Sequence, residues 1–163
     1  TVHFPAYEDD SSYFVRKFLN GEIDNPNPYA VVMMYSLDRY LYLNGHPELK
    51  TVMQDAESND IVLCDRYTTS TFMYQIAMLQ AKDTYKITDG AQMAKFIYDT
   101  NHTLLGMPEP SLTLLLSAST EATTALAKER AKVTNVPLDT LEKDKALQDR
   151  INRNMSYILY YYN

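Results

Sequence analysis

The tripeptide Asp-Arg-Tyr combines a metal-binding carboxylate with a phosphate-binding guanidinium, and it occurs twice in this chain, at 38–40 and 65–67. The second copy directly follows the short apolar run 61–64, and such a run is typical of a strand buried on both faces. In open α/β sheets, ligands bind beyond the carboxyl ends of the strands, where helix N-termini also favour anions. Asp65 is therefore a candidate metal ligand and Arg66 a candidate phosphate ligand. The alternative is an ion pair that only caps the turn.

Two predicted helices carry side chains that suit a planar base with polar edges. After Arg66, the hydroxyl of Ser70 and the ring of Tyr74 lie one turn apart on a common face, with the amide of Gln75 beside them. On the helix of the first tripeptide, Tyr35 and Arg39 are also four residues apart. The alternatives are an ordinary water-facing helix surface for the first group and a surface cation–π pair for the second.

The elements that would position these residues are strands alternating with helices. Strands are predicted at 2–4, 61–64 and 112–116. Helices are predicted at about 13–20, 28–44, 47–57, 69–81, 89–105 and 119–130, and from 139 to the tyrosine-rich end. This alternation predicts an α/β fold, a parallel sheet covered by helices, as a single domain over 1–163. Because the chain begins within a predicted strand and stops within a predicted helix, we expect the domain to be truncated at both ends.

Composition excludes several classes of function. The 15 basic and 21 acidic residues give a net charge of −6, which leaves no basic surplus for binding a nucleic-acid polymer. The four glycines lie far apart at 21, 45, 90 and 106, so this chain contains neither a GxxxxGK[ST] loop nor a GxGxxG turn. No apolar run approaches the roughly 18 residues of a membrane span. A lone cysteine, Cys64, predicts a reducing, cytoplasmic location.

In their order along the chain, these motifs resemble those of the thymidylate kinase family. The matching segments are Phe4-Pro5-Ala6-Tyr7, Tyr35-Ser36-Leu37-Asp38-Arg39, Asp65-Arg66-Tyr67-Thr68-Thr69-Ser70 with Tyr74-Gln75, the strand 112–116, and the acidic pair Asp139 and Glu142. The resemblance implies the fold of a P-loop nucleoside monophosphate kinase. It also implies transfer of the γ-phosphoryl group of ATP to dTMP, giving dTDP.

The same resemblance implies a base-binding role for five residues. Tyr35 would stack on thymine, and Arg39 would donate to its 4-carbonyl, which rejects cytosine because that base presents an amine there. Ser70 and Gln75 would address the base edge, with Tyr74 packed beside it.

For the phosphates, the resemblance implies that Arg66 binds the phosphate of dTMP and that Asp65 lies near Mg²⁺, with ATP as co-substrate. It implies a lid-like loop at about 128–139, whose positive charge would come from Lys128, Arg130 and Lys132. It also implies a homodimer, for which the apolar helical faces around 30–41 and 76–79 are candidates.

The main departure from the family is that its P-loop precedes the Phe-Pro segment and is not part of this chain. Two alternatives therefore stay open. One is a deoxynucleoside kinase, which also uses an Asp-Arg pair at a strand end but takes thymidine as acceptor. The other is a P-loop-less protein that binds a nucleotide or acts as a scaffold without catalysis.

Overall fold

The computed structural model describes residues 1–24, 26–55, 61–82, 84 and 86–161, and these form a mostly helical molecule. The structure is 65% helical, and the described residues include only two strands, β1 (Val2–His3) and β2 (Cys64–Asp65). The strands pair in parallel, with Val2 opposite Cys64 and His3 opposite Asp65. The predicted α/β fold, a parallel sheet covered by helices in the manner of the P-loop nucleoside monophosphate kinases, is therefore wrong.

The prediction failed at the two apolar runs that were expected to be central strands. Of the run 61–64, only Cys64 belongs to β2, and the run 112–116 forms no ladder with any residue that the structure describes. The side chains of Leu112, Leu114 and Leu116 are 76%, 72% and 90% exposed. Apolar composition favours a strand, but a strand forms only where a neighbouring backbone satisfies its N–H and C=O groups.

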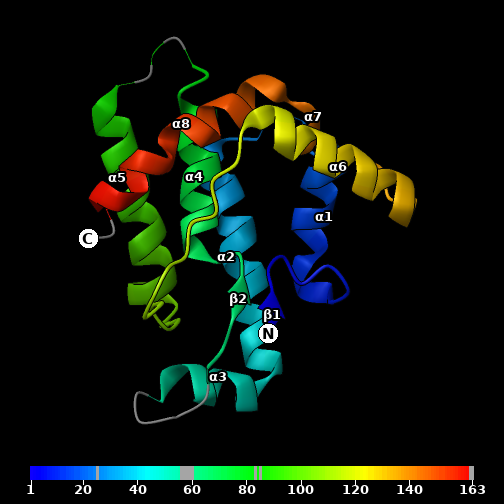
Figure 1. Cartoon of the computed structure of the whole chain (residues 1–163). Coiled ribbons are helices and arrows are strands. Elements are labelled where there is room, and N and C mark those ends of the chain that lie inside the picture. Colours follow the sequence, from blue (N-terminus) through cyan, green and yellow to red (C-terminus); the bar gives the residue numbers. More distant parts are fainter. Residues whose placement is uncertain (25, 56–60, 83, 85, 162–163) are drawn as a thin grey trace.

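Most of the molecule is a set of helices, as Figure 1 shows, and the larger of the two hydrophobic clusters formed by the described residues lies among them. The helices that supply this core are α1 (Tyr13–Leu19), α2 (Pro28–Gly45), α4 (Thr68–Leu79), α5 (Ile87–Tyr98) and α8 (Lys145–Tyr161). Helix α4 packs against α2, α5 and α8. The core contains Val15 of α1, Val31 of α2, Phe72 of α4, Ile97 of α5 and Leu147 of α8.

The predicted helix starts are confirmed at α2 and at α6 (Thr120–Thr134). Asn27 caps α2 by accepting a hydrogen bond from the backbone N–H of Tyr29 at 2.9 Å, with Pro28 in the first turn. Ser119 caps α6 by accepting from the backbone N–H of Ala122 at 3.2 Å.

Two predicted helices are divided in the structure. The helix expected over 89–105 consists of α5 followed by a π-helical turn, η2 (Asp99–Leu104). The helix expected from 139 consists of α7 (Thr140–Lys143) and α8. The short helix α3 (Pro47–Gln54) and the 3₁₀ turn η1 (Asp10–Ser12) complete the described elements.

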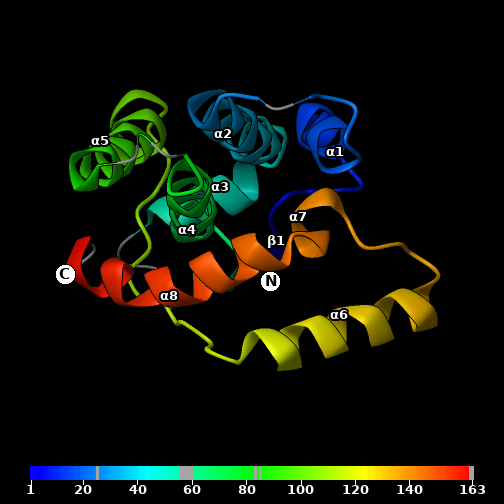
Figure 2. The same cartoon turned by 90° about the horizontal axis from the view of Figure 1, so that it is seen from above.

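Helix α6 stands apart from the helical body, as the view in Figure 2 makes clear. Among its described residues only Thr120 is buried, and the side-chain amide of Asn152 in α8 donates to the Thr120 hydroxyl at 2.9 Å. The lid-like loop predicted at about 128–139 is largely helical, because α6 continues to Thr134. No helix in the described part of the chain has both the length and the apolar character needed to cross a bilayer.

Candidate functional site

A cavity lies between α2, α4 and α7, with Phe4 and Pro5 on one side of it. Its free volume is ≈ 30 Å³, about the space of one water molecule. It adjoins a larger cavity of ≈ 420 Å³ beneath α6, and Arg66, Tyr74 and Glu142 line both. A ligand the size of a nucleotide therefore enters the inner cavity only if the side chains at this junction move outward.

The structure brings together most of the residues selected from the sequence. Those that line the inner cavity are Tyr35, Arg39, Arg66, Ser70, Tyr74 and Gln75. They reach it from two helices, α2 and α4, and from the turn that precedes α4. The spacing arguments for a shared helix face thus describe the actual arrangement, in which polar groups from both helices converge on one space.

Arg39 is a buried wall of this cavity and not part of a surface cation–π pair. It is 1% exposed, and its two terminal nitrogens donate to the hydroxyl of Thr71 at 3.0 Å and to the side-chain oxygen of Asn101 at 3.1 Å. Its guanidinium also lies 5.8 Å from the ring centre of Tyr67. These contacts fix the position of a cation inside the protein.

The neighbouring Asp38 has a structural role that the sequence did not reveal. Its carboxylate is buried and accepts hydrogen bonds from the backbone N–H of Ala6, at 3.3 and 3.4 Å, and from the hydroxyl of Ser11 at 3.1 Å. Burial raises the pKa of Asp38 above its ordinary value, and these hydrogen bonds oppose the shift. Asp38 thus ties the segment that contains Phe4 and Pro5 to α2, beside the cavity.

Gln75 is the most unusual side chain of the cavity. It is fully buried, and neither its amide nitrogen nor its amide oxygen has a hydrogen-bond partner in the described structure. An unsatisfied buried polar group costs about 1–3 kcal/mol, so most buried groups of this kind are paired. A ligand edge that both donates and accepts would satisfy both atoms.

Arg66 lies at the junction of the two cavities in a strained backbone conformation. Its φ of 66° is in the left-handed region, which non-glycine residues rarely adopt and which is concentrated at functional sites. Burial alone would lower the pKa of Arg66, but the oxygens of Tyr74, Tyr7, Tyr35 and Asp65 raise it above its ordinary value. The guanidinium of this exposed residue is therefore a permanent cation at the junction of the two cavities.

The sequence reasoning assigned no site role to Asp139 or Glu142, which also line the inner cavity. Burial raises the pKa of Asp139; Glu142 adds to this shift, while backbone hydrogen bonds and Arg66 oppose it. Burial likewise raises the pKa of Tyr35, so its hydroxyl is neutral at physiological pH. Only the family resemblance had pointed to the acidic pair, because these residues are far from the cavity-lining helices in sequence.

The remaining predicted residues lie outside the inner cavity. Lys128 and Lys132 are exposed on α6, and Arg130 lines only the larger cavity, where it pairs with Glu142. Asp65 is exposed and forms a hydrogen bond with His3, with 2.8 Å between the carboxylate oxygen and the ring nitrogen.

The described residues contain no group of three or more His, Cys, Asp or Glu side chains that could hold a metal ion. Asp65 fits Mg²⁺ as one ligand among several. Mg²⁺ at nucleotide sites binds one or two carboxylates, and its other ligands are phosphate oxygens and water.

The chain matches no protein-family model, and no curated protein matches it significantly. Function must therefore be inferred from the geometry of the cavity.

Proposed function

We propose that the chain binds dTMP as the acceptor in a thymidylate kinase-like reaction, in which the γ-phosphoryl group of ATP is transferred to give dTDP. The observation that carries the proposal is the unpartnered, fully buried amide of Gln75, which shares one cavity with the guanidinium groups of Arg39 and Arg66. An amide and a guanidinium suit the edge of a base, and a second guanidinium at the mouth suits a phosphate.

The base end of the cavity favours thymine over cytosine. Arg39 can only donate hydrogen bonds, so it complements a carbonyl and opposes an amine at the same position. Gln75 can both donate and accept, which matches the adjacent N–H and C=O groups of a thymine or uracil edge. The ring of Tyr35 supplies a flat wall in the same cavity.

The phosphate end is the junction of the two cavities, where Arg66 lies. Phosphoryl transfer depends on positioning and charge neutralisation more than on a covalent intermediate, and a strained, permanently charged Arg66 suits that requirement. When bound with ATP, Mg²⁺ would neutralise the transferring phosphates, and Asp65 is the residue of this chain that we assign to it.

The binding half of the proposal is tested by calorimetric titration with dTMP, dUMP, dCMP and thymidine. We expect affinity to fall in the order dTMP, dUMP, dCMP, because the cavity rejects the amine of cytosine. Equal affinity for dTMP and dCMP would contradict the base assignment. Tighter binding of thymidine than of dTMP would contradict the phosphate assignment and favour a deoxynucleoside kinase.

The catalytic half is tested by following dTDP formation from ATP, Mg²⁺ and dTMP by anion-exchange chromatography. Formation of dTDP that is lost in Arg66→Ala supports the kinase. Tight dTMP binding without dTDP would instead support a nucleotide-binding protein that does not catalyse transfer.

We also propose that the protein forms a two-fold homodimer through α2. Met33, Leu37 and Leu41 are exposed at four-residue intervals and so form one apolar stripe. The other candidate face, 76–79, is mostly core, since Ile76, Ala77 and Leu79 are buried. Sedimentation should give a dimer mass for the native chain and a monomer mass for Leu37→Glu; a monomeric native chain would refute the proposal.

A further inference from the structure

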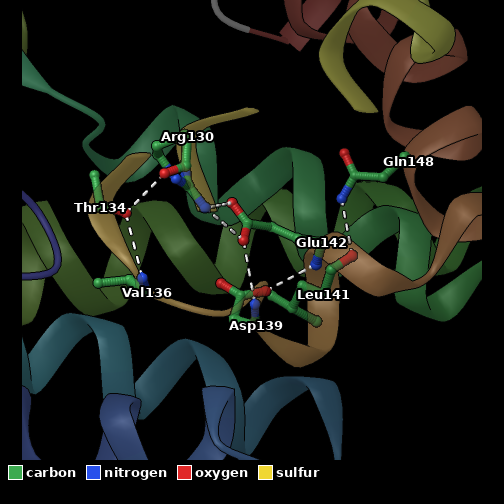
Figure 3. Close-up of polar contacts among 7 residues, drawn as sticks. All are labelled: Arg130, Thr134, Val136, Asp139, Leu141, Glu142 and Gln148. Atoms are coloured by element: carbon green, nitrogen blue, oxygen red, sulfur yellow. Dashed lines mark hydrogen bonds and ion pairs between the residues drawn. The ribbon is translucent and has the colours of Figure 1, made fainter. Parts of the chain in front are cut away.

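Arg130 of α6 and Glu142 of α7 form a two-point ion pair, drawn in Figure 3. One terminal nitrogen of Arg130 lies 2.9 Å from one carboxylate oxygen of Glu142 and 2.8 Å from the other. The Glu142 side chain is only 19% exposed, so the pair is partly shielded from water. It links the outlying helix α6 to the wall of the inner cavity.

Glu142 also binds Asp139, because the two residues form a capping box at the start of α7. The backbone N–H of Asp139 donates to a carboxylate oxygen of Glu142 at 3.1 Å, and the backbone N–H of Glu142 donates to the Asp139 carboxylate at 2.8 Å. Figure 3 shows the three side chains in sequence, from Arg130 through Glu142 to Asp139. Because Asp139 and Glu142 both line the inner cavity, the position of this wall depends on the chain of contacts.

Helix α7 needs such support because it has only four residues. A single helical turn is not stable by itself, so its position is set by its tertiary contacts. Its other contacts include Leu141, which is buried in the helical core, and two hydrogen bonds: the Thr140 hydroxyl donates to the backbone oxygen of Leu19 at 2.7 Å, and the Gln148 amide donates to the backbone oxygen of Leu141 at 3.0 Å. None of these contacts involves the Glu142 side chain, which Arg130 binds.

We propose that Arg130 is a positioning residue for the acceptor site, which holds α7 in place through Glu142 and does not itself contact the nucleotide. This inference rests on the proposed function. It differs from the role that the family resemblance implied for Arg130, which was to supply part of the positive charge of a lid-like loop. Arg130 lies outside the lining of the inner cavity, and the Glu142 carboxylate that it binds is part of that lining. The residue therefore acts on the site through the carboxylate.

Hydrogen exchange tests the positioning role in the protein without any nucleotide. In Arg130→Ala, the backbone amides of Asp139 and Glu142 should exchange about three- to tenfold faster, the range expected when a partly shielded ion pair is lost. Lys95→Ala is the matched control, because it removes one positive charge and one ion pair, that between Lys95 of α5 and Asp99 of η2, neither of which lines the inner cavity. Unchanged exchange at 139 and 142 in Arg130→Ala would overturn the proposal.

Nucleotide binding distinguishes positioning from direct contact with phosphate. We expect Arg130→Ala to weaken dTMP binding about three- to tenfold in the native chain and to have no further effect in a Glu142→Gln background, because Arg130 acts only through that carboxylate. A loss of dTMP affinity that persists in the Glu142→Gln background would show a direct phosphate contact and would overturn the proposal. If the native chain does not bind dTMP, the proposed function fails, and the exchange experiment alone then decides whether Arg130 holds α7.

A double-mutant cycle separates the ion pair from other effects of the two substitutions. Arg130→Ala and Glu142→Gln should each accelerate exchange at Asp139, and the double variant should exchange little faster than either single variant. Additive effects would show that the two residues act independently, which contradicts the proposed chain of contacts.

Discussion

The helical side of the molecule and its sheet side, the segments 1–4, 61–67 and 112–116, bury their apolar residues to different extents. On the helical side, Phe72 and Ile97 are fully buried among the helices, and even the charged Arg39 is enclosed and hydrogen-bonded. On the sheet side, Val2, Phe4 and Tyr67 belong to a smaller buried cluster, but Ile61 and Leu116 are exposed almost completely. The candidate site lies where the two sides meet, with its base-binding residues on the helices and Arg66 on the turn after β2.

This difference shows which interactions each side requires. A helix satisfies its backbone groups internally, so an amphipathic segment needs only one apolar face to pack against its neighbours. A strand satisfies its backbone only through another strand, which is distant in sequence. The helical side therefore forms from local signals and shared packing. In the leucine-rich segment 112–116, Leu112, Leu114 and Leu116 remain exposed, and Leu115 packs partly against the helical core.

The largest expected effect comes from truncating the same residue type on the two sides. Leu147 of α8 is 2% exposed and belongs to the helical core, whereas Leu116 is 90% exposed. Leu147→Ala should lower the free energy of unfolding by about 2–5 kcal/mol, through lost burial and a residual cavity. Leu116→Ala should change it by less than about 0.5 kcal/mol.

Urea unfolding of the two leucine variants, measured side by side, checks this comparison. A loss at Leu116 as large as that at Leu147 would show that the segment 112–116 is packed in solution, and that the contrast between the two sides is smaller than the structure indicates.

The same contrast explains how much of the fold was predictable. The caps at Asn27 and Ser119 and the apolar spacing of α2 and α4 act within a few residues, so the starts of α2 and α6 were predicted, and α2 and α4 were predicted nearly to their ends. The end of α6 was not predicted, because the helix continues into the expected lid-like loop. The prediction of central strands at 61–64 and 112–116 failed, because an apolar run does not reveal which segment could pair with it. The break between α5 and η2 was also missed. Asn101 lies in η2, where its side chain accepts a hydrogen bond from Arg39, distant in sequence, and donates to the backbone oxygen of Ile97.

The next effect in size concerns the phosphate end of the site. Arg66→Ala should weaken dTMP binding by about 10- to 100-fold, which corresponds to the 1.5–3 kcal/mol typical of hydrogen bonds to charged groups. Thymidine has no phosphate, so its affinity should stay unchanged. Titration calorimetry with both ligands checks this, and equal losses for the two would remove Arg66 from the phosphate-binding role. Arg66→Lys should recover part of the affinity, because it keeps the charge but loses the planar guanidinium.

A smaller effect, with opposite signs for stability and binding, is expected at the base end. Gln75→Met keeps the size of the side chain but removes two buried, unpartnered polar atoms. The free energy of unfolding of the ligand-free protein should rise by about 1–2 kcal/mol, while dTMP affinity should fall by roughly 5- to 30-fold. Thermal unfolding with and without dTMP measures both quantities. A variant that is less stable without ligand would show that Gln75 is paired in solution and is not reserved for a ligand.

The candidate site was predictable where one helix face or one turn brings its residues together. Helical spacing united Tyr35 with Arg39 and Ser70 with Tyr74, and the structure places all four on one cavity. Helical spacing did not reveal Asp139, which lies at the cavity only because α7 packs there. Nor did it show that Arg130 binds Glu142, because their spacing of 12 residues spans the end of one helix and the start of another.

The smallest expected change in stability is at Asp139, which caps α7 and lines the inner cavity. Burial raises its pKa above the ordinary value of 3.8, so the folded protein binds this proton more tightly than the unfolded chain does. The ionised carboxylate therefore reduces stability at pH values above its raised pKa. That penalty is relieved as the pH falls through the raised pKa toward 3.8. Asparagine cannot titrate, yet its side-chain oxygen can still accept the backbone N–H of Glu142, as the carboxylate does.

Asp139→Asn should therefore flatten the dependence of the free energy of unfolding on pH between the ordinary carboxyl pKa of 3.8 and the raised pKa of the folded state, with a small gain in stability at pH 7. Denaturant titrations of the native chain and the variant at several pH values measure the difference between the two curves. The raised pKa of Asp38 is common to both proteins and cancels in that difference. Parallel curves would mean that Asp139 is solvated in solution, and that α7 does not seal the cavity as tightly as its contacts indicate.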